Sequence, residues 1–219
     1  SFDLDIAYTN EPLFKNRHRK NKTSSPLSDG NWYKISVSNS GLHVLNASFF
    51  DSIGLNITSI DPKKIRLYGM HNGMLSEDNG DFRYDGLQEL AILVEGESDG
   101  VFNSQDKVLF YAQSPDNLLS KKSNDNLYHI KNKYSDKNYY FLNVDKGTGK
   151  RVGTIQTSSQ SANVYCTSFN ELQFHEYDVK NFLLSGREWY GEAFDIDNSQ
   201  SFSFSFPNRS ETDSIYIKT

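Results

Sequence analysis

Cysteine is almost absent from this chain of 219 residues, since Cys166 is the only one. A single cysteine cannot form an internal disulfide, so a packed core must hold the fold, and cysteine usage leaves the cellular compartment open. Long apolar runs are also absent, because no stretch approaches the roughly 20 residues of a membrane-spanning helix. The chain begins at Ser1 without a recognisable signal peptide and stops within the strand-like residues 215–219. We therefore expect a processed or excised piece of a longer protein.

Positive charge is not in excess. The chain has 23 Lys and Arg against 28 Asp and Glu, a formal net charge of −5. This balance argues against nucleic acid as the main partner, because phosphate binding needs a basic face. The basic run at 15–22 is a local exception. Next to Ser24, Ser25 and Pro26, it is better interpreted as a solvated loop than as a phosphate or lipid contact.

Aromatic residues are plentiful at 14%, and they indicate a folded protein with an aromatic core despite only 36% hydrophobic residues. Short β-prone runs separated by Asn-Gly and Asp-Gly turns predict an all-β fold, a β-sandwich or barrel-like domain. Residues 41–45 are predicted to return as the hairpin partner of 32–37. The predicted strands are 2–8, 32–37, 41–45, 65–68, 90–94, 108–113, 127–130, 139–144, 152–157, 202–206 and 214–218.

One short helix is expected over residues 47–55, with Asn46 as its N-cap and Gly54 at its end. A second helical or irregular segment is a candidate at 177–184. The polar stretch at 157–162 is typical of a linker. The expected organisation is an N-terminal strand and basic linker (1–30), a β-rich domain (31–158) and a second, smaller β-rich unit (159–219).

The stretch 94–111 contains an acidic turn between two β-prone runs. Its carboxylates, Glu95, Glu97, Asp99 and Asp106, are candidate ligands for a hard cation such as Ca²⁺. The complete EF-hand pattern is missing. The alternative, which is favoured, is a solvated hairpin turn whose carboxylates accept hydrogen bonds from nearby backbone N–H groups.

A second motif, SGREWYGE at 185–192, has no nucleophile-elbow setting. Its candidate role is a domain or partner contact built from Arg187, Glu188, Trp189, Tyr190 and Glu192.

Cys166 lacks a glycine-rich oxyanion turn, so a catalytic pair with His129 or His175 is disfavoured against a plain buried or half-buried cysteine. No catalytic residue is assigned.

Several short motifs follow one another along the chain. None of them identifies a protein family by itself, but their order and spacing together are fairly specific. Together they extend over roughly residues 31–206. They are WYKISV (32–37), SGLHVL (40–45), IDPKKIRLYG (60–69), GML (73–75), LQELAILVEGESDG (87–100), DKVLFYAQSP (106–115), YSDKNYYFL (134–142) and SGREWYGE (185–192).

This series resembles the N-terminal region of the PorU family, the gingipain-like (peptidase C25-type) cysteine peptidases that act as sortases of the type IX secretion system in Bacteroidota. The resemblance implies a cell-surface, outer-membrane-associated protein exported through the periplasm. Family members remove C-terminal signals from cargo and attach the cargo to surface lipopolysaccharide, in an attachment complex with the outer-membrane protein PorV. Their catalytic His and Cys belong to a later domain, which no position here matches.

The resemblance therefore implies a non-catalytic module that supports or docks the downstream peptidase domain. Two alternatives stay open. One is a calcium-dependent carbohydrate-binding β-sandwich in which Trp32, Trp189 or a tyrosine stacks on sugars. The other, strongly disfavoured, is a stand-alone hydrolase that uses Glu188 and Glu192.

Overall fold

The computed structural model describes residues 25–70, 73–78, 80–120, 127–157, 159–161, 163–184, 186 and 188–217. The predicted strand at 2–8, the basic run at 15–22 and Arg187 lie outside the described residues. No helix in the described part is long and apolar enough to cross a membrane.

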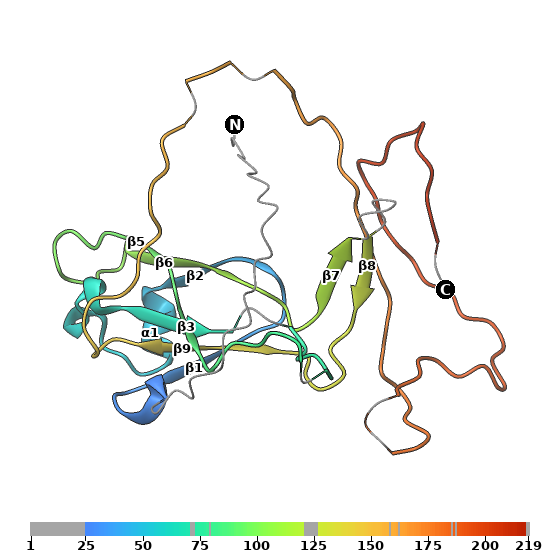
Figure 1. The fold of residues 1–219 in the computed structure, drawn as a ribbon, viewed down its shortest axis with the longest axis horizontal. Helices are drawn as coiled ribbons and strands as arrows, with labels where there is room; N and C mark the ends of the chain where they lie inside the picture. The colour runs from blue at the N-terminus through green and yellow to red at the C-terminus, as the bar shows by residue number, and fades with distance from the viewer. Residues whose placement is uncertain are drawn as a thin grey trace.

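Antiparallel strands in two sheets make up most of the regular structure, which confirms the all-β prediction (Figure 1). Sheet A has the order β1-β9-β3-β4 and sheet B the order β2-β6-β5, while β7 and β8 form a separate hairpin. Both sheets have edge strands, so the β-sandwich prediction holds and the barrel alternative does not. The strands are β1 (Tyr33–Val37), β2 (Gly41–Asn46), β3 (Arg66–Gly69), β4 (Gln88–Leu90), β5 (Leu93–Glu95), β6 (Lys107–Ala112), β7 (Asn117–Ser120), β8 (Leu127–Ile130) and β9 (Asn138–Asn143).

The predicted hairpin between residues 32–37 and 41–45 is wrong. β1 pairs with β9, and β2 pairs with β6, so the short link between β1 and β2 carries the chain from one sheet to the other. Both strands bury their apolar side against the shared core, through Val37 and Leu45. The single strand predicted at 90–94 is likewise divided between β4 in sheet A and β5 in sheet B. A continuous apolar run in the sequence does not show where the chain passes from one sheet to the other.

The predicted helix is present as α1 (Ala47–Ser52), between β2 and the 3₁₀ turn η2 (Ile57–Ser59). The side chain of Asn46 accepts a hydrogen bond from the Phe49 N–H at 3.0 Å, which confirms its capping role. Gly54 follows the helix with φ +79°, a conformation that favours glycine. Two further 3₁₀ turns, η1 (Pro26–Ser28) and η3 (Pro62–Lys64), precede β1 and β3.

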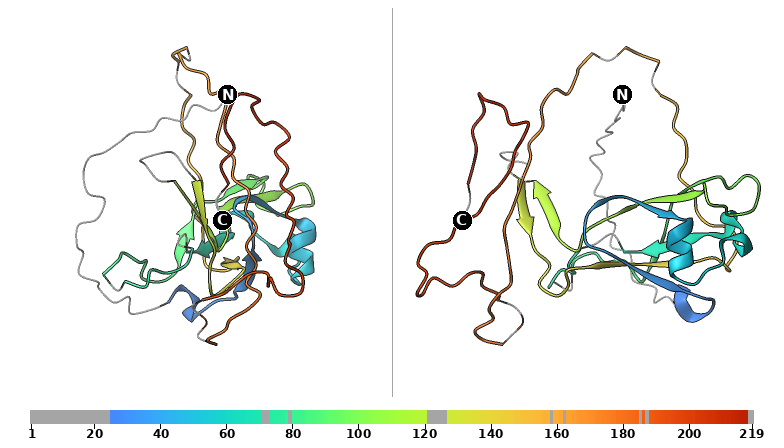
Figure 2. Two further views of the ribbon diagram at one scale, coloured as in Figure 1. Left: turned by 90° about the vertical axis from the view of Figure 1, so that its right-hand side faces the viewer. Right: turned by 180° about the vertical axis from the view of Figure 1, so that it is seen from behind.

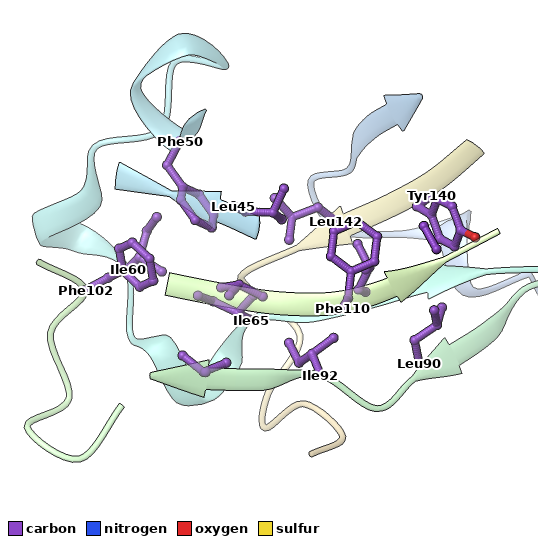
Figure 3. Packing of buried hydrophobic residues seen from close by; sticks show 14 of the residues in the cluster. Leu45, Phe50, Ile60, Ile65, Leu90, Ile92, Phe102, Phe110, Tyr140 and Leu142 are labelled. Atoms are coloured by element: carbon purple, nitrogen blue, oxygen red, sulfur yellow. The ribbon is translucent and has the colours of Figure 1, made fainter. Parts of the chain in front are cut away.

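The core lies between the two sheets and is closed at one end by α1 (Figure 3). Phe50 projects from α1 and contacts Phe102, with 4.8 Å between the ring centroids. Phe110 of sheet B and Tyr140 of sheet A meet at 5.6 Å, and the Tyr140 hydroxyl accepts a hydrogen bond from the Gln113 N–H. Aromatic rings thus pack among the aliphatic side chains of the core.

The chain after β9 leaves the sandwich in an arc and returns beside the β7–β8 hairpin (Figures 1 and 2). We call the described residues within 163–217 the C-terminal extended region. Its described part contains no named strand or helix, and its backbone pairing is an isolated antiparallel bridge between Lys180 and Tyr190.

The helical alternative at 177–184 is therefore wrong for the described residues. The strands predicted at 152–157 and 202–206 and over the described part of 214–218 are not formed either. Alternating apolar residues make a strand only when a neighbour completes its backbone hydrogen bonds. Within the part of the chain that the structure describes, these segments have no such ladder beyond the bond from the Val152 N–H to the Ile92 carbonyl. The domain division at 158 stays a prediction.

Candidate functional site

The acidic turn connects β5 to β6, and three of its carboxylates accept hydrogen bonds. Glu97 accepts a hydrogen bond from Arg151 Nε at 2.7 Å, and Asp99 Oδ1 accepts one from the Val101 N–H at 3.0 Å. Asp106 is only 4% exposed, and its Oδ2 accepts a hydrogen bond from the Asn103 N–H. Glu95 pairs across the ladder with Lys107. The turn thus shows the arrangement of the favoured alternative, in which carboxylates bind backbone and side-chain donors.

Calcium binding at this turn stays a prediction, which a titration can test. In the described residues, no three His, Cys, Asp or Glu side chains are grouped so that they could hold a metal. Because Arg151 and backbone donors already occupy the carboxylates of Glu97, Asp99 and Asp106, we expect chelator-treated protein to show no change in melting temperature when Ca²⁺ is added. A saturable calorimetric heat and a rise in melting temperature would instead establish the turn as a calcium site.

The 185–192 motif lies in the C-terminal extended region, where it meets the segment around Lys180. The Tyr190 N–H donates to the Lys180 carbonyl, and the Val179 and Lys180 N–H groups donate to the Tyr190 carbonyl. Trp189 is 41% exposed and Tyr190 is 49% exposed. The Tyr190 hydroxyl contacts Glu188 at 3.4 Å. These aromatic rings are available for a contact, as the prediction requires, but the structure does not test that role.

Glu192 is bound to His175, with 2.6 Å between Oε1 and Nε2. The hydrogen bond from His175 lowers the pKa of the Glu192 carboxyl. Glu188 contacts Tyr190 and Glu192 contacts His175. The stand-alone hydrolase that would use these two carboxylates stays a disfavoured alternative.

An ion-pair cluster that the sequence did not reveal fixes the C-terminal extended region to the β7–β8 hairpin. The His129 side chain is 8% exposed and stacks on Phe174 with 3.5 Å between ring centroids. Its two ring nitrogens each lie 3.1 Å from a carboxylate oxygen, on Asp116 and Glu176. Lys131 adds a salt bridge to Asp178 at 3.0 Å. The partners lie far apart along the chain, so no spacing signal could have identified them.

Among the described residues, no base lies beside Cys166. Cys166 is exposed, and its thiol donates to the Ser168 carbonyl at 3.2 Å. His129 and His175 are both bound to carboxylates. The expectation that Cys166 is buried or half-buried is wrong, because its side chain is exposed.

The outer face of sheet A carries a polar and aromatic cluster around Arg66. Its guanidinium donates to both carboxylate oxygens of Glu89, at 3.0 and 2.6 Å, and to the Lys146 carbonyl. Trp32 packs edge-on against Tyr68 at 5.2 Å, and the Lys146 ammonium lies over the indole at 5.6 Å. The Trp32 ring therefore already has an aromatic and a cationic neighbour, and this packing gives no support to sugar stacking at Trp32.

The Arg66–Glu89 pair makes stability depend on pH. Burial alone would raise the pKa of Glu89, but hydrogen bonds from Arg66 and from the Lys150 N–H outweigh it and hold that pKa below its ordinary value. A carboxyl with a lowered pKa stabilises the fold above its unfolded pKa, about 4.3 for Glu, and loses this contribution as the pH falls through the lower folded pKa. We expect Glu89→Gln to cost about 1–2 kcal/mol at neutral pH and progressively less in acid.

Urea unfolding at neutral pH and at several acidic pH values measures this difference. Glu77→Gln is the control, because Glu77 forms an exposed pair with Lys133 at 3.8 Å and should change stability by less than about 0.5 kcal/mol. A cost for Glu89→Gln that stays constant into strong acid would contradict the assignment.

Comparison with known proteins supports the predicted resemblance in part. The chain is similar to a solved structure described as dimeric latent PorU from Porphyromonas gingivalis, with 27% sequence identity and a TM-score of 0.50. The similarity covers 66% of this chain and 12% of the PorU chain, so it concerns a small part of that protein. No family model and no curated protein matches the chain. Part of this chain is thus a PorU-like β-rich region.

Proposed function

We propose that this chain is the non-catalytic N-terminal β domain of a PorU-type sortase of the type IX secretion system. The observation that carries the proposal is the similarity in sequence and fold to a small part of a PorU chain. In this proposal the parent protein is a cysteine endopeptidase and transpeptidase at the cell surface. It removes C-terminal signals from cargo and attaches the cargo to lipopolysaccharide, while the domain described here supports or docks the peptidase domain.

The chemistry of the described side chains is consistent with a supporting role. Cys166 contacts a backbone carbonyl, and His129 and His175 contact carboxylates. Carboxylates of the acidic turn (Glu97, Asp99 and Asp106) and of the 185–192 motif (Glu188 and Glu192) have structural partners. A support domain needs a stable core and a surface for its partner, and the sandwich provides such a core.

The C-terminal extended region is the surface that we assign to the peptidase domain. Many of its large apolar side chains are solvent-exposed, for example Phe169 at 81% and Ile196 at 94%. An isolated domain rarely exposes so many large apolar side chains, and their exposure favours a role in an interface. Trp189 and Tyr190 are of the residue types that most often dominate binding energy.

Binding between this chain and the separately purified peptidase domain of the same parent protein tests the proposal. We expect a complex by calorimetry, and we expect Trp189→Ala with Tyr190→Ala to weaken it by about 2 kcal/mol or more. Tyr134→Ala is the matched control, because Tyr134 is 67% exposed but lies outside the C-terminal extended region. No complex, or equal losses in both variants, would contradict this assignment.

Direct docking to PorV is the second partner that we propose, at the outer-membrane surface. Co-elution of this chain with purified PorV on a sizing column would support it. Separate elution would remove PorV as a direct partner and leave the supporting role for the peptidase domain intact.

A further inference from the structure

The outer face of sheet B is apolar, although an antiparallel sheet with one solvated face normally presents polar residues there. The pairing register places Leu42 beside Tyr111, and Leu109 between Val44 on one side and Leu93 on the other. Leu42 is 65% exposed and Tyr111 is 55% exposed. These five residues form two cross-strand rows, which we call the sheet B patch. A contiguous apolar patch across three strands of a well-packed sheet indicates a covered surface.

The residues on the inner face of the same strands fix the pairing register and therefore the position of the patch. Val108, Phe110 and Ala112 of β6 alternate with the patch residues and are almost completely buried in the core. A shift by one residue would expose these three side chains. The apolar character of both faces is therefore a property of the sequence, and the outer face needs its own cover.

We propose that the N-terminal residues 2–8 of this chain cover the sheet B patch. These residues lie outside the described part, and their sequence FDLDIAY alternates in polarity. In an extended conformation Phe2, Leu4, Ile6 and Tyr8 fall on one side and Asp3 and Asp5 on the other. The apolar side matches the sheet B patch in chemical character, and the two aspartates remain toward water.

The chain length and the charges agree with this cover. The described chain starts at Ser25, beside η1 and β1 of sheet A, on the opposite side of the sandwich from the outer face of sheet B (Figure 1). Stacked sheets are about 10 Å apart, whereas residues 9–24 can span up to roughly 50 Å when extended. Lys107 and Glu95 are exposed cross-strand neighbours at the edge of the patch, so the rim carries balanced charge and does not repel the segment. This inference does not depend on the proposed function.

Photo-crosslinking in the full chain tests the proposal. With p-benzoylphenylalanine in place of Leu42, we expect illumination at low micromolar concentration to link position 42 to residues 2–8 of the same molecule. The control places the same group at Ser36, which is exposed on β1 of sheet A, and should give no such link. Links from position 42 to a second copy, to other parts of the chain or to no residue would overturn the proposal.

A second measurement avoids the bulky photoreactive group. Hydroxyl-radical footprinting should modify Leu42 and Tyr111 several-fold faster in the Phe2→Ser, Leu4→Ser and Ile6→Ser triple variant than in the natural chain. Tyr134 is the internal reference, since it is 67% exposed and lies away from the patch. Equal modification of Leu42 and Tyr111 in the two proteins would overturn the proposal.

Discussion

Replacing Phe50 by Ala is expected to lower the free energy of unfolding by about 3–5 kcal/mol. Phe50 is completely buried and contacts both Phe49 and Phe102. It is the side chain through which α1 closes the end of the sandwich (Figure 3). Its truncation removes the packing and leaves a cavity that the two sheets cannot collapse to fill, because their spacing is fixed by the remaining core.

Equilibrium unfolding in urea, followed by circular dichroism, measures this effect. Phe169→Ala is the control, because Phe169 is 81% exposed and should change the stability of the isolated chain by less than about 0.5 kcal/mol. A cost below about 1 kcal/mol for Phe50→Ala would mean that α1 does not close the core in solution.

Replacing Gly96 by Ala is expected to cost about 2–4 kcal/mol, because two separate penalties act at this position. Gly96 has φ +92°, which strains any residue with a Cβ. An added Cβ would also clash with Asp106 Oδ1. Since Asp106 is buried, its carboxylate would have to move, and it would lose the hydrogen bond that it accepts from the Asn103 N–H.

Gly100→Ala separates the two penalties. Gly100 lies in the same turn at φ +81°, but nothing is within 4 Å of an added Cβ. It should therefore cost only about 1 kcal/mol, the conformational part alone. Thermal or urea unfolding of both variants measures the difference. Equal costs would show that the close contact between Gly96 and Asp106 does not contribute to stability.

The candidate site was predictable only where local chemistry decides it. Asp99 and Asp106 lie in a turn that the sequence identified, and they accept backbone hydrogen bonds from residues two or three positions away. Glu97 is different, because its partner Arg151 comes from a distant segment that passes beside β5. The pairing of His129 with Asp116 and Glu176 is of the same kind. Side chains that only the fold brings together have no characteristic spacing in the sequence by which they could be recognised.

The sequence by itself determined the elements that local interactions specify. Strand alternation identified β1, β2, β6 and β9, and the Asn46 cap with Gly54 identified α1. Each of these depends on periodicity or on hydrogen bonds within a few residues, so a single chain segment carries the information.

Only the tertiary structure decided which strands pair and which segments remain extended. β1 lies next to β9 rather than β2, and the apolar run at 90–94 is shared between two sheets. Residues 202–206 alternate as well as β1 does, yet they form no strand. The physical reason is that a strand is stabilised by a neighbour's backbone and by a shared core, and both come from distant parts of the chain.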